Sequence, residues 1–261
     1  MLKDYYIGIF QNRYILFSLV NRDLIQKYRR SILGIAWSII TPLGLAIIVG
    51  AVYGILFETP FDVIVPLIFA GINPWTFMAG CADGGTNTFL SAEGYIKQST
   101  VSLQIFPLRI TITNFITLMY SIITFFGIYL FMKPDLFSAN MLMVFPGLII
   151  VFFFSWGMTN ITSIINLYIR DFQPFQSLIL QGLFYVTPII YPVDMIAKNG
   201  GDWIYKFNPF YYMLEVVRMP MLGHEMPTLQ MYLIAVSISL VVYIVSIVVV
   251  MANKKTIAYR L

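Results

Sequence analysis

Six long stretches of this chain are apolar and carry no charged side chain. They are residues 31–57, 63–82, 110–132, 136–169, 172–193 and 226–253. A helix needs roughly 20 apolar residues to cross the hydrocarbon core of a bilayer, and each stretch is long enough. Backbone polar groups must be satisfied inside the bilayer, so helices are the expected spanning element. We therefore predict an all-α membrane protein with six transmembrane helices, near residues 32–56, 64–90, 108–131, 143–168, 174–192 and 229–252.

Composition supports this class and excludes several functions. Charged residues make up 11% of the 261 residues, against about 25% in an average soluble domain. The single cysteine, Cys81, rules out an intrachain disulfide framework and is expected to be a buried packing residue. The only histidine, His224, has no companion for a metal, and the chain has no Gly-x-x-x-x-Gly-Lys-Ser/Thr phosphate loop. We expect no cleavable signal, no nucleic-acid partner, and neither a catalytic residue, a metal nor a cofactor in this chain.

The basic residues are distributed unevenly between the two sides of the predicted bundle. Six crossings place both termini on one side, together with the loops near 91–107 and 169–173. That side holds twelve of the sixteen lysines and arginines. The positive-inside rule therefore puts both termini of this multi-pass protein in the cytoplasm.

The segment 194–225 is harder to interpret, because residues 203–222 are moderately apolar. They contain Lys206, Glu215 and Arg218, and prolines 209 and 220 interrupt them. A crossing here would move the basic C-terminal tail, 254–261, to the outside. We therefore expect an external segment with one or two short re-entrant helices, covered by protein at that depth.

Residues 1–30 are predicted to form a cytoplasmic amphipathic interface helix. Apolar side chains recur every three or four positions over residues 7–28, and basic residues occupy the rest of the surface. Such a helix lies in the headgroup layer. It is either a simple lipid anchor or a docking element for a cytoplasmic subunit. Arg22-Asp23 beside a tyrosine favours docking, because an anchor alone would not need these charged and aromatic side chains.

Two cytoplasmic loops are further candidates for contact with a partner. The polar stretch 91–104 is either an ordinary loop or a short coupling helix, and Pro107 suits the first turn of the following helix. Arg170 and Asp171 separate the fourth and fifth stretches. Neighbours in sequence do not face each other on a helix, so these two side chains are expected to reach different partners.

Polar and aromatic residues inside the membrane are candidates for a substrate path. Intramembrane polar groups should face protein or a cavity, and bonds between helices explain most of them. Asp83 stands out because glycines 80, 84 and 85 surround it. It is also the one residue that would support a proton-coupled carrier. Most aromatic residues are expected to be interface belts and packing, and some could stack on sugar rings.

In its order of motifs the chain resembles the membrane subunit of type-2 ABC exporters that carry lipid-linked polysaccharides such as O-antigen, capsule and teichoic acid. The resemblance covers nearly the whole length. It rests on the Arg22-Asp23 junction followed by Tyr28, Ser31, Leu33-Gly34, Trp37 and Pro42, then on Arg170-Asp171, Pro188, Tyr191-Pro192, Asn208-Pro209, Glu215, Arg218 and Gly223.

The resemblance implies a homodimer of six-helix subunits with two separate cytoplasmic ATPase subunits, which would bind the ATP and Mg²⁺. An aromatic-lined channel would lie at the dimer interface. The candidate docking and coupling residues are Arg22, Asp23, Tyr28, Arg29, Glu93, Tyr95, Lys97, Arg170 and Asp171. The candidate channel residues are Trp37, Trp75, Asp83, Asn87, Gln181, Tyr185 and Tyr191, and those of the external re-entrant segment are Asn208, Pro209, Glu215 and Arg218.

The expected function is export of a polyprenyl-linked polysaccharide by a transmembrane domain at residues 31–253. An exporter of the same fold for a small hydrophobic drug or lipid is the nearest alternative. It would be favoured by a fused nucleotide-binding domain or a large external domain, and this chain contains neither. A membrane-embedded glycosyltransferase or ligase would need clustered external acids, and here the external acids are scattered.

Overall fold

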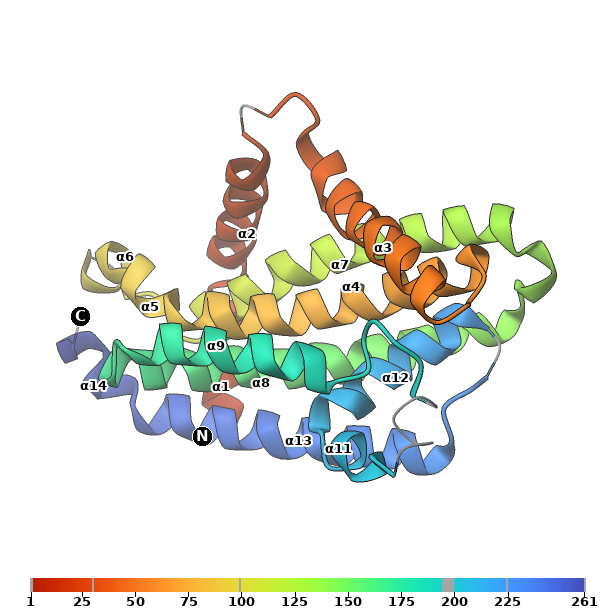
Figure 1. Ribbon diagram of the computed structural model, residues 1–261. Helices are drawn as coiled ribbons and strands as arrows, with labels where there is room; N and C mark the ends of the chain where they lie inside the picture. Colours follow the sequence, from red (N-terminus) through yellow and green to blue (C-terminus); the bar gives the residue numbers. More distant parts are fainter. Residues whose placement is uncertain (1, 30, 99, 194–199, 224, 261) are drawn as a thin grey trace.

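The computed structural model describes residues 2–29, 31–98, 100–193, 200–223 and 225–260. Within these residues the regular structure is helical, and none of them forms a strand. Most of the long helices lie side by side along one axis, whereas the helix over residues 13–28 stands across them and the helix over residues 37–56 runs obliquely (Figure 1). The prediction of an all-α fold is confirmed.

Five segments of the described residues are long and apolar enough to cross a membrane. They match the first four and the last of the predicted crossings, and they make the chain a multi-pass membrane protein. Their helices are α3 Trp37–Leu56, preceded by the 3-10 turn η1 Gly34–Ala36, then α4 Phe61–Thr86, α7 Ile105–Met132, α8 Val144–Tyr168 and α13 Leu229–Ala252.

The fifth predicted crossing forms a shorter helix than expected. Helix α9, Phe172–Val186, has 15 residues, or about 22 Å at 1.5 Å per residue. The hydrocarbon core is roughly 30 Å thick. The helix ends at Thr187, in extended conformation before Pro188, because a residue that precedes proline disfavours the helical region. The span expected over 174–192 is therefore a helix in its first part only.

Two short helices, α11 Asp202–Lys206 and α12 Pro209–Leu222, follow in the predicted external segment. Part of that segment, residues 194–199 and 224, lies outside the described residues. Pro209 is the first residue of α12, where a missing backbone N–H costs nothing. Gly223 ends α12 with a φ of 72°, the left-handed conformation that glycine adopts most easily. Helix α12 packs against α4, α8 and α13.

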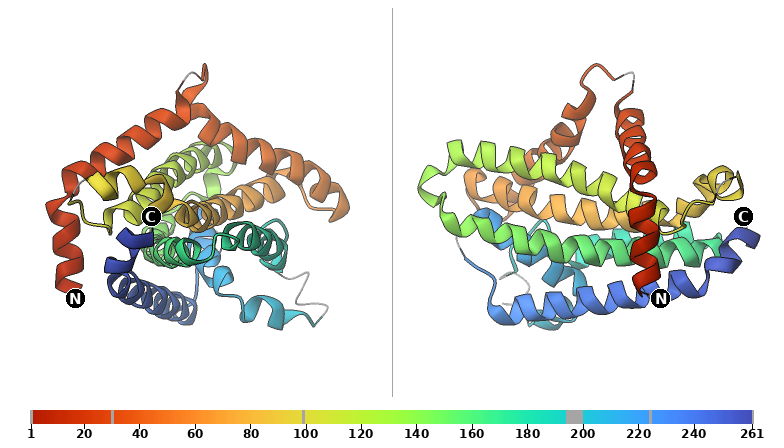
Figure 2. Two further views of the ribbon diagram at one scale, coloured as in Figure 1. Left: turned by 90° about the vertical axis from the view of Figure 1, so that its left-hand side faces the viewer. Right: turned by 180° about the vertical axis from the view of Figure 1, so that it is seen from behind.

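The N-terminal region forms two helices, α1 Leu2–Gln11 and α2 Arg13–Tyr28, where the sequence predicts one. The break is at Asn12, whose amide nitrogen donates to the Gly8 carbonyl at 2.8 Å and the Ser102 hydroxyl at 3.1 Å. Helix α1 packs beside α13 and α2 packs along α7. Seen along the bundle, α2 and α3 form an arch over its flank (Figure 2).

Helix α1 is more than a surface anchor, because Tyr5 is fully buried. The hydroxyl of Tyr5 accepts a hydrogen bond from Asn160 of α8 at 3.2 Å, and Tyr6 bonds to Tyr243 of α13 at 2.8 Å. Burial raises the pKa of the Tyr5 phenol. These contacts tie the first helix of the chain to the last long one.

The loops that the sequence assigns to the cytoplasm gather at one end of the bundle. The short helices α5 Thr88–Ser91, α6 Glu93–Gln98 and α14 Lys254–Arg260 lie there, together with the turn between α8 and α9 (Figure 1). The 3-10 turns η2 Pro134–Leu136 and η3 Ala139–Met143 lie at the opposite end, with the start of α13.

Helix α8 is the centre of the bundle and approaches its neighbours closely at glycines. A Cβ on Gly147 would lie 2.1 Å from the Val216 carbonyl oxygen of α12, and one on Gly157 would lie 3.1 Å from the Tyr243 backbone of α13. Gly85 of α4 makes an equally close approach to Thr159 of α8. Small residues at such crossings are the usual means of packing helices in lipid.

Candidate functional site

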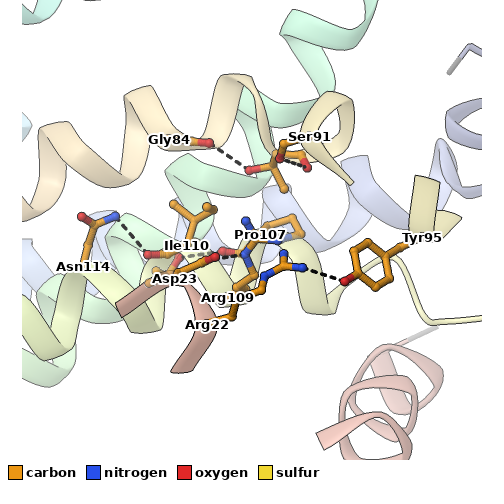
Figure 3. A network of polar contacts seen from close by, with 11 residues as sticks. Arg22, Asp23, Gly84, Ser91, Tyr95, Pro107, Arg109, Ile110 and Asn114 are labelled. Atoms are coloured by element: carbon orange, nitrogen blue, oxygen red, sulfur yellow. Dashed lines mark hydrogen bonds and ion pairs between the residues drawn. The ribbon is translucent and has the colours of Figure 1, made fainter. Parts of the chain in front are cut away.

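The predicted docking residues on α2 bond to two other parts of the chain (Figure 3). The Arg22 guanidinium donates to the Tyr95 hydroxyl of α6 at 2.6 Å and lies 5.4 Å from its ring centroid. The next residue, Asp23, accepts from the Arg109 Nε of α7 at 2.6 Å. The side chains of this ion pair are only 16% and 11% exposed. Adjacent residues of α2 therefore contact α6 and the spanning helix α7.

Helix α6 presents the other predicted coupling residues. Lys97 and Glu93 pair with each other at 2.6 Å, one helical turn apart, and both are about half exposed. Tyr95 keeps 41% of its surface exposed despite its bond to Arg22. This arrangement leaves an aromatic ring and two opposite charges available at the end of the bundle.

The remaining docking candidates lie in two different places. Arg170 and Asp171 are exposed in the turn between α8 and α9. Arg29 is exposed just after α2. Tyr28 is the last residue of α2, and its side chain lies outside the described part of the structure.

Four of the predicted channel residues line one cavity between α4 and α9. Its volume is about 440 Å³, within the usual size range of ligand pockets. The cavity combines a carboxylate, an amide, a hydroxyl and three aromatic rings. Its lining residues are Trp75, Ala79, Asp83, Ser177, Leu180, Gln181, Phe184 and Tyr185.

Asp83 is held in place from across the cavity. Its Oδ1 accepts from the Ser177 hydroxyl at 3.0 Å and from the Gln176 amide at 3.3 Å, both on α9. Asp83 therefore joins α4 to α9. Neither bond uses its Oδ2, so one carboxylate oxygen remains for a hydroxyl donor.

The aromatic part of the cavity is partly packed and partly open. Trp75 is 6% exposed and contacts Phe184 edge to face, with ring centroids 5.9 Å apart. Tyr185 is 67% exposed. The Tyr191 hydroxyl donates to the Tyr185 carbonyl at 2.6 Å, so this residue lies at the end of the same wall. Trp37 lines a different cavity, and Asn87 is exposed at the end of α4.

The residues of the predicted external segment are largely buried and bond to the residues just after α9. The Asn208 side chain caps α12 by accepting from the Phe210 N–H at 3.0 Å and donates to Thr187 at 2.7 Å. Glu215 and Arg218 form a buried ion pair, and Arg218 Nη1 donates to the Pro188 carbonyl at 2.5 Å. In α11, the Asp202 carboxylate raises the pKa of the exposed Lys206.

Comparison with known proteins decides the family. The sequence profile described as ABC-2 type transporter matches residues 14–222, which is most of the chain and spans both the α2–α6–α7 contacts and the α4–α9 cavity. This chain belongs to the ABC-2 type transporter family.

Named relatives point in the same direction. An O-antigen export system permease protein RfbA of Klebsiella pneumoniae is 29% identical over 204 residues, which cover 77% of each chain. A protein of the same name from Myxococcus xanthus is 25% identical over 240 residues, 89% of this chain and 90% of that protein. This ABC-2 permease is therefore a membrane subunit of a transporter rather than an enzyme, and its family implies association with ATP-binding subunits.

Sequence reasoning gives no role to several residues that complete these sites in the ABC-2 permease. In the sequence Arg109 counts only as one of the predicted cytoplasmic charges. Its place two residues after Pro107, in the first turn of a spanning helix, could have indicated that it pairs with an acid. Gln176 and Ser177, which hold Asp83, give no such signal because polar residues near a helix end are common.

Proposed function

We propose that this ABC-2 permease exports a polyprenyl-linked polysaccharide from the cytoplasm across the inner membrane. The α4–α9 cavity carries this proposal. Sugars offer hydroxyl groups to carboxylates and amides, and their apolar C–H faces stack on aromatic rings. Asp83, Gln181, Trp75 and Tyr185 supply these two kinds of partner in one wall. The printed names of the relatives support the same class of cargo.

We propose further that two copies of the chain enclose the path and that separate cytoplasmic subunits hydrolyse the ATP. On this proposal α2 and α6 contact those subunits. The Arg22–Tyr95 and Asp23–Arg109 contacts would then pass a movement of the ATPase to α7. ATP binding would shift the population between closed and open states of the path. The gathering of α6, α14 and the α8–α9 turn at one end supports cytoplasmic termini.

The cavity residues can be tested by replacing the chromosomal copy with variants and measuring polysaccharide at the cell surface. We expect Gln181→Ala and Tyr185→Ala to reduce surface polysaccharide severalfold at an unchanged protein level. Phe175→Ala is the matched control, because Phe175 is an exposed aromatic residue of α9 that does not line the cavity. Normal display in both cavity variants would contradict the proposal.

The same strains separate export from the alternative functions. Loss of an exporter should leave finished, lipid-linked polymer in the inner leaflet. Loss of a glycosyltransferase or ligase should leave shorter or untransferred sugars instead. An exporter of small drugs or lipids should leave the polysaccharide unchanged and alter only resistance or lipid composition.

A further inference from the structure

Two cavities lie one after the other on another face of α4, between α3, α4 and α7, and together they are called the cleft here. The inner cavity has a volume of about 400 Å³, and residues of α2, α3, α4 and α7 line it. The outer cavity has a volume of about 170 Å³. The α7 residues that line them follow one another at helical spacing, from 114, 117, 118 and 121 in the inner cavity to 125, 128, 129 and 132 in the outer one.

The inner cavity is polar and carries a positive charge. Lys27 of α2 lines it and donates from its Nζ to the Thr117 hydroxyl of α7 at 3.3 Å. The residues described as lining it include this cation and no acid. The other polar lining residues are Ser38, Thr41, Asn73, Thr76, Asn114, Thr117 and Ser121.

Two of these polar groups are bonded within their own helices, and two others are exposed. The Asn73 and Asn114 amide nitrogens donate to their own helices, to the carbonyls of Phe69 and Ile110. Thr41 and Thr76 are exposed on the cavity wall. Polar groups inside a membrane protein should face protein or a cavity rather than lipid tails, and here they face the cavity.

The outer cavity is apolar. Its lining residues are Leu43, Ile47, Phe61, Val65, Pro66, Phe69, Phe125, Ile128, Tyr129 and Met132. The Tyr129 hydroxyl donates to the Leu222 carbonyl at 2.8 Å, so this residue offers its ring rather than a polar group. The cleft therefore changes from a basic, hydroxyl-rich section to an apolar section along the bundle axis.

We propose that this cleft binds one anionic phospholipid of the cytoplasmic leaflet, with its phosphate beside Lys27 and an acyl chain in the outer cavity. The charge of the inner section complements a phosphate, and the order of polar and apolar sections matches a lipid whose head lies toward the cytoplasm. The outer section offers no hydrogen-bonding path for a glycan. The α4–α9 cavity lies on a different side of α4, where Trp75, Ala79 and Asp83 line it. The α4 residues that line the cleft include Asn73, Thr76 and Phe77.

Lipid binding to the purified full chain tests this proposal without any transport assay. Native mass spectrometry during titration with phosphatidylglycerol or phosphatidylcholine gives the affinity for each lipid. We expect the wild-type chain to prefer phosphatidylglycerol. Lys27→Gln should weaken the binding of phosphatidylglycerol about fivefold, as expected for one lysine near an anionic headgroup. The affinity for phosphatidylcholine should stay unchanged. Arg13→Gln is the matched control, because Arg13 is also on α2 but does not line the cleft.

A second variant tests the acyl-chain section. Ile128→Trp fills the outer cavity and should weaken the binding of both lipids by the same factor. The preference for phosphatidylglycerol should be retained. An unchanged preference in Lys27→Gln would overturn the proposal. So would displacement of phosphatidylglycerol by polyprenyl diphosphate, which would assign the cleft to the cargo lipid, or loss of the bound lipid on dimerisation, which would assign it to a second copy of the chain.

Discussion

At the scale of single residues, Asp23 is where the structure adds most to the prediction. The Arg22-Asp23 pair suggests two charges offered to a partner, yet the Asp23 carboxylate is already bonded to Arg109. Arg22 uses its guanidinium on Tyr95, whose ring stays exposed. We infer that Asp23 positions α2 on α7, while Arg22 and Tyr95 remain the surface that a partner can reach.

Removal of Asp23 should therefore destabilise the protein. Asp23→Ala leaves the buried Arg109 without its counter-ion, which should lower the free energy of unfolding by about 2 kcal/mol or more. A double-mutant cycle with Arg109→Ala, measured by thermal unfolding in detergent, should show a coupling energy above about 0.5 kcal/mol. Lys97→Ala is the control, since its exposed pair with Glu93 should contribute little. If Asp23→Ala unfolds like wild type but no longer binds the ATPase, the carboxylate acts in docking itself.

The residue-level site could be predicted only in part, for a physical reason. Asp83 and Gln181 are conspicuous because polar groups are costly in an apolar helix. Which helix faces meet is decided by packing over the whole bundle, so the bonds from Ser177 and Gln176 to Asp83 could not be derived from one sequence. The position of Trp37 in another cavity has the same origin.

At the scale of helices, hydrophobic length predicted five spans well and failed where proline and polar residues intervene. Helix α9 ends at Val186, before Pro188, and α12 packs against α4, α8 and α13. Apolar content could not show that the Glu215–Arg218 pair is buried between helices. Burial of the two charges depends on their pairing with each other and on the bond from Arg218 to the Pro188 carbonyl, which the fold brings together. The break at Asn12 also depends on a distant residue, Ser102.

The close contact between α8 and α12 predicts a stability effect. Gly147→Ala would place a methyl group 2.1 Å from the Val216 carbonyl oxygen, so the helices must move apart. We expect a loss of about 1–3 kcal/mol, the usual cost of overpacking a core, seen as a lower thermal unfolding midpoint. Gly127→Ala on α7 is the matched control, because a methyl group added there would meet no neighbouring atom within 4 Å. Equal midpoints for the two variants would contradict the tight α8–α12 packing.

At the scale of the whole molecule, the arrangement has two ends with different tasks. The end with α6, α14 and the α8–α9 turn carries the exposed charges proposed to meet ATPases. Towards the other end, α12 packs against α4, α8 and α13, and its buried ion pair holds the chain after α9. The polar cavity beside Asp83 lies between them, and so does the lipid cleft on a separate face of α4.

The proposed orientation can be tested with single cysteines in a Cys81→Ala background. An impermeant thiol reagent added to intact spheroplasts should label cysteine at Lys206 or Glu225, both exposed in the external region. Cysteine at Lys254 should react only after the membrane is permeabilised. Labelling of Lys254→Cys from outside, together with protection of Glu225→Cys, would mean that α12 crosses the membrane and that the termini lie on opposite sides.

The seating of α1 against α8 and α13 sets an order for biogenesis. Tyr5 leaves the ribosome first, but its partner Asn160 is 155 residues later, and the Tyr243 partner of Tyr6 is 237 residues later. Nascent chains generally fold from the N-terminus as they are made, and here that rule cannot hold for the first ten residues. Helix α1 must wait until the final hydrophobic helix has been inserted. Its docking is therefore a late step of assembly, because it depends on the insertion of α13.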